Sequence, residues 1–156
     1  MKLFRRILQA ILLLIIVAII SGTIFLNHLK KRAIPDYGEP VNLENLREEV
    51  TVYRDSLAIP HVYAKNEQDL YRVVGYVTAQ DRLWQMDLLR RITTGTLSEI
   101  FGPDMISADQ MFRAFNFSEK SRRVLAQTDP EILRCLEAYT DGVNQFINKN
   151  RKNRPF

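Results

Sequence analysis

The side chains best suited to chemistry lie in one segment of the sequence and shortly after it. Within residues 75–91, "GYVTAQDRLWQMDLLRR", an acid, a base and an amide stand among core-like residues, and a second acid and base follow four residues apart; these five are Asp81, Arg82, Gln85, Asp109 and Arg113. A buried, unpaired carboxylate is too costly to persist, so Asp81 requires a partner, for which Arg82, Arg90, Arg91 and Arg113 are available. Asp81 is therefore a catalytic acid or a member of a structural polar network. We favour the network, because no second carboxylate or histidine shares its helix face.

The other candidates for a nucleophile or a base lack suitable neighbours. Five serines have no histidine or lysine at a recognisable spacing: Ser56, Ser98, Ser107, Ser118 and Ser121. His61 lies in a β-rich run and suits a strand residue better than a base, and His28 flanks an apolar segment. Cys135 is the only cysteine, which excludes an internal disulfide and a cysteine-based zinc site. Its apolar neighbours at helical spacing favour packing over nucleophilic attack.

The helix that must position Asp81 is predicted from Asn66 to Thr93, with Asn66 as the N-cap and Gly95 as the stop. One face carries Asp81 among apolar side chains, namely Leu70, Val73, Val74, Val77, Trp84 and Leu88. On the opposite side, Gly75 and Ala79 are small enough to let another backbone approach closely. The sequence therefore predicts a helix between two layers.

The remaining elements predict a mixed fold. Two β-rich runs, residues 50–55 and 59–64, indicate a hairpin with Pro60 at the entry to its second strand. Shorter helices are predicted at residues 108–115, 119–127 and 130–148. Because an isolated hairpin is marginally stable, either the helices cover it alone or its partner strands lie outside this chain.

The amino-terminal end differs in composition from the rest. Residues 7–26 carry no charge and are about long enough to cross a ~30 Å hydrocarbon core as a helix. We interpret residues 1–32 as a transmembrane signal anchor, residues 33–48 as a juxtamembrane linker and residues 49–156 as the folded part. A cleaved signal peptide is the alternative. Basic residues flank the apolar run on both sides, so charge gives no orientation.

The overall charge of +4 comes from this amino-terminal end. Residues 1–32 hold six of the 22 basic residues and no acids, which leaves 16 basic and 18 acidic residues, or −2, for the rest. A nucleic-acid partner is therefore not indicated.

Several segments, in order, resemble the start of the α-chain of penicillin acylases. They are "YRD…IPHVYA", "GYVTAQDRLWQMDLLRR", "GTLSEIFG", the pair Asp109 and Arg113, and "LEAYTDGVNQFI". These enzymes are N-terminal-nucleophile hydrolases and include cephalosporin and acyl-homoserine-lactone acylases. The resemblance implies an α+β fold that forms part of a four-layer αββα arrangement. It also implies that Asp81, Arg82, Gln85, Asp109 and Arg113 build a structural polar network.

The resemblance places the chemistry outside this chain. Such enzymes cleave an amide with the first residue of their β-chain, whose free α-amine acts as the base, and the β-chain also supplies the oxyanion donors. The sequence ends before the region that usually holds the calcium ligand, acyl-pocket residues and cleavage site. We therefore assign no catalytic, cofactor-binding or metal-binding residue to this chain, and we expect calcium only in the full-length protein.

Two functions stay open at this point. The first is the membrane-anchored amino-terminal part of an amidohydrolase precursor that acts on linear acyl-amine bonds of small molecules, inactive alone and partnered by the β-chain and remainder of the precursor. The second is a membrane-tethered, non-enzymatic interaction module derived from the α-chain. Since the resembled enzymes are mostly exported, we expect the folded part in the periplasm or otherwise outside the cytoplasm.

Overall fold

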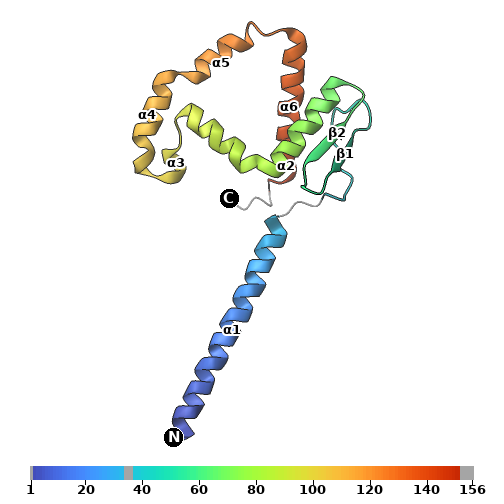
Figure 1. Ribbon diagram of the computed structural model, residues 1–156. Coiled ribbons are helices and arrows are strands. Elements are labelled where there is room, and N and C mark those ends of the chain that lie inside the picture. Colours follow the sequence, from blue (N-terminus) through green and yellow to red (C-terminus); the bar gives the residue numbers. More distant parts are fainter. Residues whose placement is uncertain (1, 34–36, 152–156) are drawn as a thin grey trace. The chain divides into compact units, whose positions relative to one another are not determined.

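The computed structural model describes residues 2–33 and 37–151, and the chain divides into two compact units, Met1–Pro40 and Val41–Phe156. The first unit contains helix α1 (Lys2–Ala33). The second contains, in chain order, β1 (Thr51–Arg54), β2 (Pro60–Tyr63), α2 (Glu67–Thr94), α3 (Ser98–Phe101), the 3₁₀ turn η1 (Pro103–Met105), α4 (Ile106–Phe115), α5 (Phe117–Leu125) and α6 (Pro130–Lys149) (Figure 1).

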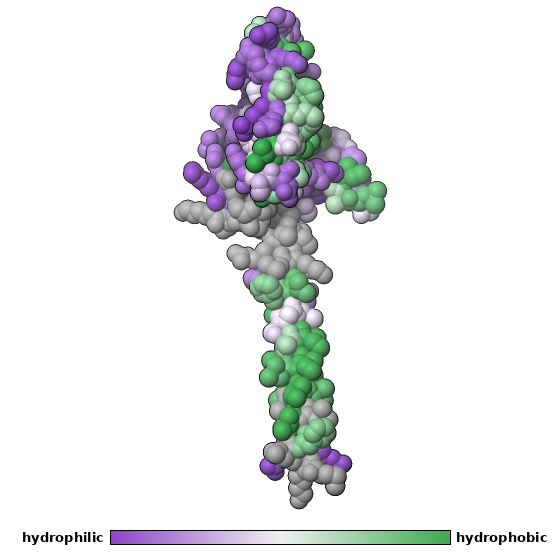
Figure 2. Space-filling model, turned by 90° about the vertical axis from the view of Figure 1, so that its left-hand side faces the viewer, coloured by the Kyte–Doolittle hydropathy of each residue, from purple (hydrophilic) through white to green (hydrophobic). Residues whose placement is uncertain are grey.

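Helix α1 is apolar along most of its length, and Figure 2 shows it as a nearly continuous run of hydrophobic side chains. Two hydroxyl groups within the apolar run bond to the helix itself: the Ser21 hydroxyl donates to the Val17 carbonyl at 2.9 Å, and the Thr23 hydroxyl donates to the Ile20 carbonyl at 2.8 Å. Such internal bonds suit a helix in lipid, where water cannot satisfy polar groups. By length and composition the stretch Phe4–His28 suits either a membrane anchor or a signal sequence.

The predicted hairpin is present. β1 and β2 are antiparallel, with Val52 opposite Val62 and Arg54 opposite Pro60. The alternation of side chains places Val52 and Val62 partly in the core, whereas Tyr53 and Tyr63 are exposed and meet edge to face. Among the described residues these two strands form the whole sheet.

Helix α2 has the predicted ends. The Asn66 side chain accepts a hydrogen bond from the Asp69 backbone N–H at 2.9 Å, and Gly95 closes the helix with a left-handed φ of 64°. The sequence did not predict its sharp bend. Arg82, with φ −139° and ψ 23°, is non-helical, and Figure 1 shows the two halves of α2 running in different directions.

The first half of α2 lies between two layers, as predicted. On one side, Val73 and Val77 belong to the buried cluster on which the hairpin valines pack. On the other side α6 crosses so closely that a Cβ on Gly75 would collide with the Tyr139 backbone, and a Cβ on Gly142 would collide with the Arg72 backbone. Two glycines therefore permit the close crossing of α2 and α6.

Residues 41–48, which we expected within the 33–48 linker, pack on the second unit instead. Leu43 is a buried member of the core cluster. The Gln145 side chain bonds both backbone groups of Glu44, accepting from its N–H at 2.8 Å and donating to its carbonyl at 3.1 Å. The folded unit thus begins at about Val41 rather than Glu49. Residues 34–36 of the expected linker lie outside the described residues.

The predicted helices 108–115, 119–127 and 130–148 correspond to α4, α5 and α6, with ends that differ by a few residues. α3 and η1 were not predicted, because elements of three or four residues show no periodicity. α4 and α5 meet at Asn116, whose left-handed φ of 51° turns the chain between them.

Candidate functional site

Asp81 pairs with Arg54 of the hairpin, an arginine that was not among the partners expected from the sequence. The two carboxylate oxygens of Asp81 accept from Arg54 Nη1 at 2.8 Å and Nη2 at 3.1 Å. The Asp81 side chain is 21% exposed, so the expectation that it is buried is wrong. The expectation treated residues 66–93 as one straight helix, whereas Asp81 directly precedes the bend at Arg82.

Arg82 and Gln85 form a separate contact. Arg82 Nη1 donates to Gln85 Oε1 at 3.3 Å, and both residues are exposed. Asp109 and Arg113 lie elsewhere, on α4. The described contacts place Asp81 with Arg54, Arg82 with Gln85, and Asp109 with Arg113 on α4.

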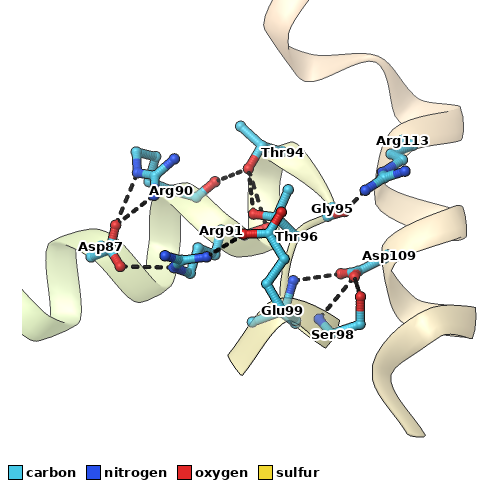
Figure 3. Close-up of polar contacts among 11 residues, drawn as sticks. Asp87, Arg90, Arg91, Thr94, Gly95, Thr96, Ser98, Glu99, Asp109 and Arg113 are labelled. Atoms are coloured by element: carbon cyan, nitrogen blue, oxygen red, sulfur yellow. Dashed lines mark hydrogen bonds and ion pairs between the residues drawn. The ribbon is translucent and has the colours of Figure 1, made fainter. Parts of the chain in front are cut away.

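Asp109 organises the turn that follows α2 (Figure 3). Its carboxylate is almost completely buried and accepts three hydrogen bonds, from the Leu97 N–H at 2.7 Å, the Ser98 N–H at 2.9 Å and the Ser98 hydroxyl at 2.6 Å. Burial alone would raise the pKa of Asp109, but the hydrogen bonds from Ser98 and Leu97 and the nearby charge of Arg113 outweigh it and hold the pKa below 3.8. Asp109 is thus held as an ionised acceptor.

Arg113 holds the other side of the same turn. Its Nε donates to the Gly95 carbonyl at 2.8 Å, and Figure 3 shows Arg113 and Asp109 reaching from α4 toward the turn. Two features favour glycine at position 95. Its φ is positive, and a Cβ there would collide with the Asp109 carbonyl and the Arg113 side chain. The pair spaced four residues apart therefore fastens α4 to the end of α2.

A further polar cluster lies on the second half of α2. Asp87 accepts from Arg90 Nη2 at 2.7 Å and from Arg91 Nε at 2.8 Å, and Arg91 Nη1 reaches Glu99 at 2.8 Å (Figure 3). The hydrogen bonds from Arg91 and Arg90, with Arg91 contributing most, lower the pKa of Asp87. The Arg91–Glu99 pair joins α2 to α3, and the Asp87–Arg91 pair lies within α2.

The most buried charged group was not singled out by the sequence. Asp69 has no exposed surface and accepts from the backbone N–H of Arg47 at 3.1 Å, that of Glu48 at 3.0 Å and the Asn66 side chain at 2.6 Å. Arg72 lies 3.5 Å away and also binds Asp141 at 2.7 Å. Burial would raise the pKa of Asp69, but these donors and the Arg72 charge outweigh it and lower the pKa below 3.8.

The structure also gives the surroundings of three other candidates, Cys135, His61 and Ser98. Cys135 is buried, and burial, followed by the neighbouring Glu67 and Glu131, raises the pKa of its thiol, which disfavours the nucleophilic thiolate. His61 lies on β2 with Nε2 3.3 Å from Asp55 Oδ2. Ser98 donates to Asp109.

Chemically, Asp69 and Asp109 are ionised carboxylates that each accept hydrogen bonds from several donors. A group of this kind stabilises backbone geometry, whereas a general acid or base needs a pKa near the working pH and access to a substrate. Among the described residues, no group of three or more histidine, cysteine, aspartate or glutamate side chains is arranged to hold a metal ion.

Two residues that sequence reasoning missed had detectable signals. Arg54 follows Val50 and Val52 at steps of two residues, and all three are partly buried. Strand alternation therefore places Arg54 on the side that faces the helix layer. Asp69, three residues after the N-cap Asn66, is at a position that commonly completes a helix cap. In both cases the partner lies in a distant segment, which local periodicity does not identify.

The chain is similar to known proteins over most of its second unit. The sequence model of the penicillin amidase family matches residues 49–156. Penicillin G acylase of Escherichia coli is 37% identical over 114 residues, which are 73% of this chain and 14% of that protein. Acyl-homoserine lactone acylase QuiP of Pseudomonas fluorescens is 31% identical over 113 residues, which are 72% of this chain and 14% of that protein.

A solved structure is also similar. The thermostable penicillin G acylase from Alcaligenes faecalis superimposes with a TM-score of 0.61 at 33% sequence identity, over 67% of this chain and 56% of that chain. The chain therefore spans 14% of the length of these curated relatives and about half of the solved chain.

Proposed function

Because the chain belongs to the penicillin amidase family, whose sequence model matches residues 49–156, we propose that it forms the amino-terminal part of a precursor of an amide hydrolase. The mature enzyme cleaves linear amide bonds between an acyl group and an amine. This chain supplies scaffold elements, and the nucleophile, the oxyanion donors and the expected calcium ligands come from the remainder of the precursor. The family match is the observation that carries the proposal.

The polar clusters support a scaffold role for the described residues. Asp69 and Asp109 accept hydrogen bonds from neighbouring segments, and Asp87 accepts them from two arginines of its own helix. Their lowered pKa values keep them ionised at neutral pH, unable to donate a proton there. One relative is named a proenzyme, penicillin acylase 2 of a Pseudomonas strain, which agrees with a precursor that is processed into chains.

The proposal extends to fold and location. In the complete enzyme the β1–β2 hairpin joins further strands in a four-layer αββα arrangement, which supplies the partners that two strands need for stability. Helix α1 anchors the protein in the membrane, and the unit from Val41 onward faces the periplasm or exterior. The length and apolar composition of α1 support the anchor.

The test is to express the complete reading frame that contains this sequence and to screen phenylacetyl, glutaryl and long-chain acyl amides for hydrolysis. We expect processing into two chains and hydrolysis of at least one of these classes. A reading frame that stops after Phe156 in intact genomic sequence, or a processed protein without any amidase activity, would favour the non-enzymatic interaction module instead.

A further inference from the structure

The bend in α2 lies where the sequence contains none of the usual helix-breaking residues. Sharp helix bends usually occur at proline, at glycine or serine pairs, at π-bulges or where a group inserts into the helix. The residues around Arg82, "TAQDRLWQM" at 78–86, contain no proline, glycine or serine. Within this stretch the Thr78 hydroxyl donates to the Val74 carbonyl at 2.7 Å, a bond of a kind that bends helices slightly. A contact from another element is the second local influence on the bend.

One such contact reaches the residue just before the bend. Arg54 of β1 binds both carboxylate oxygens of Asp81 and also donates to Gln80 Oε1 at 3.3 Å. The same guanidinium donates to the Ala58 carbonyl in the hairpin turn at 3.0 Å. A guanidinium is planar and its donors have a fixed geometry, so this set of bonds holds one orientation of the helix relative to the hairpin.

The side chains of this ion pair are partly shielded from water. Arg54 is 14% exposed and Asp81 21% exposed, whereas the Arg90 side chain, which pairs with Asp87 on the same helix, is 58% exposed. An ion pair that is partly removed from water and bidentate is stronger and more directional than an exposed one.

We propose that Arg54 is a positioning residue that fixes the bend of α2 through Asp81, and thereby sets where the following elements lie relative to α6. The first half of α2 packs on the hairpin cluster and on α6. The second half carries the turn to which Asp109 and Arg113 fasten α4. Figure 1 shows α3 and α4 beyond the end of this second half, and α5 leading the chain back toward α6.

The experiment measures the distance between α6 and α4 by double electron–electron resonance on the full 156-residue chain in detergent micelles. Spin labels are attached through Glu137→Cys on α6 and Gln110→Cys on α4, both exposed, in a Cys135→Ala background. We expect one narrow distance distribution when Arg54 is present. In Arg54→Ala we expect a broadened distribution, or one shifted by about one helical turn, ~5 Å.

Three further variants decide the outcome. Asp81→Asn removes the charged partner and should shift or broaden the distance as Arg54→Ala does. Arg54→Lys keeps the charge without the planar donor set and should fall between. Arg90→Ala, which removes an exposed ion pair of the same helix, is the matched control and should leave the distance unchanged.

Far-UV circular dichroism accompanies each measurement, so that loss of helix is separated from movement of helices. If Arg54→Ala fails to fold, Asp81→Asn and Arg54→Lys carry the decision. Native-like distances in every folded variant that lacks the Arg54–Asp81 pair would overturn the proposal. Restoration of the native distance by the charge swap Arg54→Asp with Asp81→Arg would support it further.

Discussion

The carboxylate of Asp69 accepts a hydrogen bond of 3.0 Å from the backbone N–H of Glu48, a residue 21 positions earlier in the chain. With the bond from Arg47 N–H, this contact fastens the segment before the hairpin to the first turn of α2. Asp69 therefore satisfies two backbone donors of that segment from the first turn of α2.

Replacement of Asp69 by asparagine should destabilise the second unit. The amide is isosteric but carries one acceptor oxygen and no charge, so it cannot satisfy Arg47, Glu48 and Asn66 together. We expect the free energy of unfolding to fall by about 2–3 kcal/mol, measured by urea denaturation. Glu119→Gln, which affects a more exposed ion-pair cluster, is the control and should cost less than about 1 kcal/mol. Equal stability of Asp69→Asn and the parent would contradict this role.

The stability of the unit should decrease in acid because of Asp69 and Asp109. Their pKa values are lowered below 3.8 in the folded state, so each carboxylate favours folding above its unfolded pKa, and that contribution is lost as the pH falls through the lower, folded pKa. The measurement is the free energy of unfolding between pH 7 and pH 2. In Asp109→Asn the decrease below about pH 4 should be smaller than in the parent. An unchanged pH profile would show that Asp109 contributes no such linkage.

The crossing of α2 and α6 should not tolerate a methyl group. A Cβ on Gly75 or Gly142 would collide with backbone atoms of the other helix, which cannot move aside as a flexible side chain can. We expect Gly75→Ala and Gly142→Ala each to cost about 1–3 kcal/mol or more, seen as a lower midpoint of thermal unfolding. Gly22→Ala in α1, where a Cβ would meet nothing within 4 Å, should leave that midpoint unchanged.

Elements marked by local signals were predictable from the sequence. Asn66 and Gly95 define the ends of α2, and the spacing of Gly75 and Ala79 indicated a close helix contact. Such features depend on a few adjacent residues. The composition of residues 33–48 misled us, because turn-forming residues there surround Leu43, which inserts into the core.

The partners within the polar clusters could not be predicted in the same way. Asp81 meets Arg54, 27 positions away, only after the hairpin has docked on α2. The bend at Arg82 then removes Asp81 from the buried face that a straight helix would give it. Pairing across elements depends on their relative orientation, and neither periodicity nor propensity contains that information.

The proposed location can be tested by protease protection. In spheroplasts of cells that express the protein, an added protease should digest the unit from Val41 onward while α1 remains with the membrane. This outcome follows from α1 acting as an anchor whose carboxyl-terminal side lies outside the cytoplasm. Full protection of the unit, with digestion after detergent is added, would contradict the orientation. Recovery of the intact unit in the soluble periplasmic fraction would instead indicate a cleaved signal sequence.

The measurement that tests the central claim most directly is the turnover of the processed enzyme from the complete reading frame, with Asp81→Ala and Asp109→Ala compared with the parent. If these carboxylates hold the scaffold, both variants should yield less processed protein, because Arg54 or the turn at residues 95–98 loses its partner. The kcat per processed molecule should stay within about tenfold, ~1.4 kcal/mol, of the parent. Normal processing together with a loss of roughly 10²–10⁴ in kcat, the usual effect of removing a general acid or base, would contradict the account and identify the altered carboxylate as catalytic.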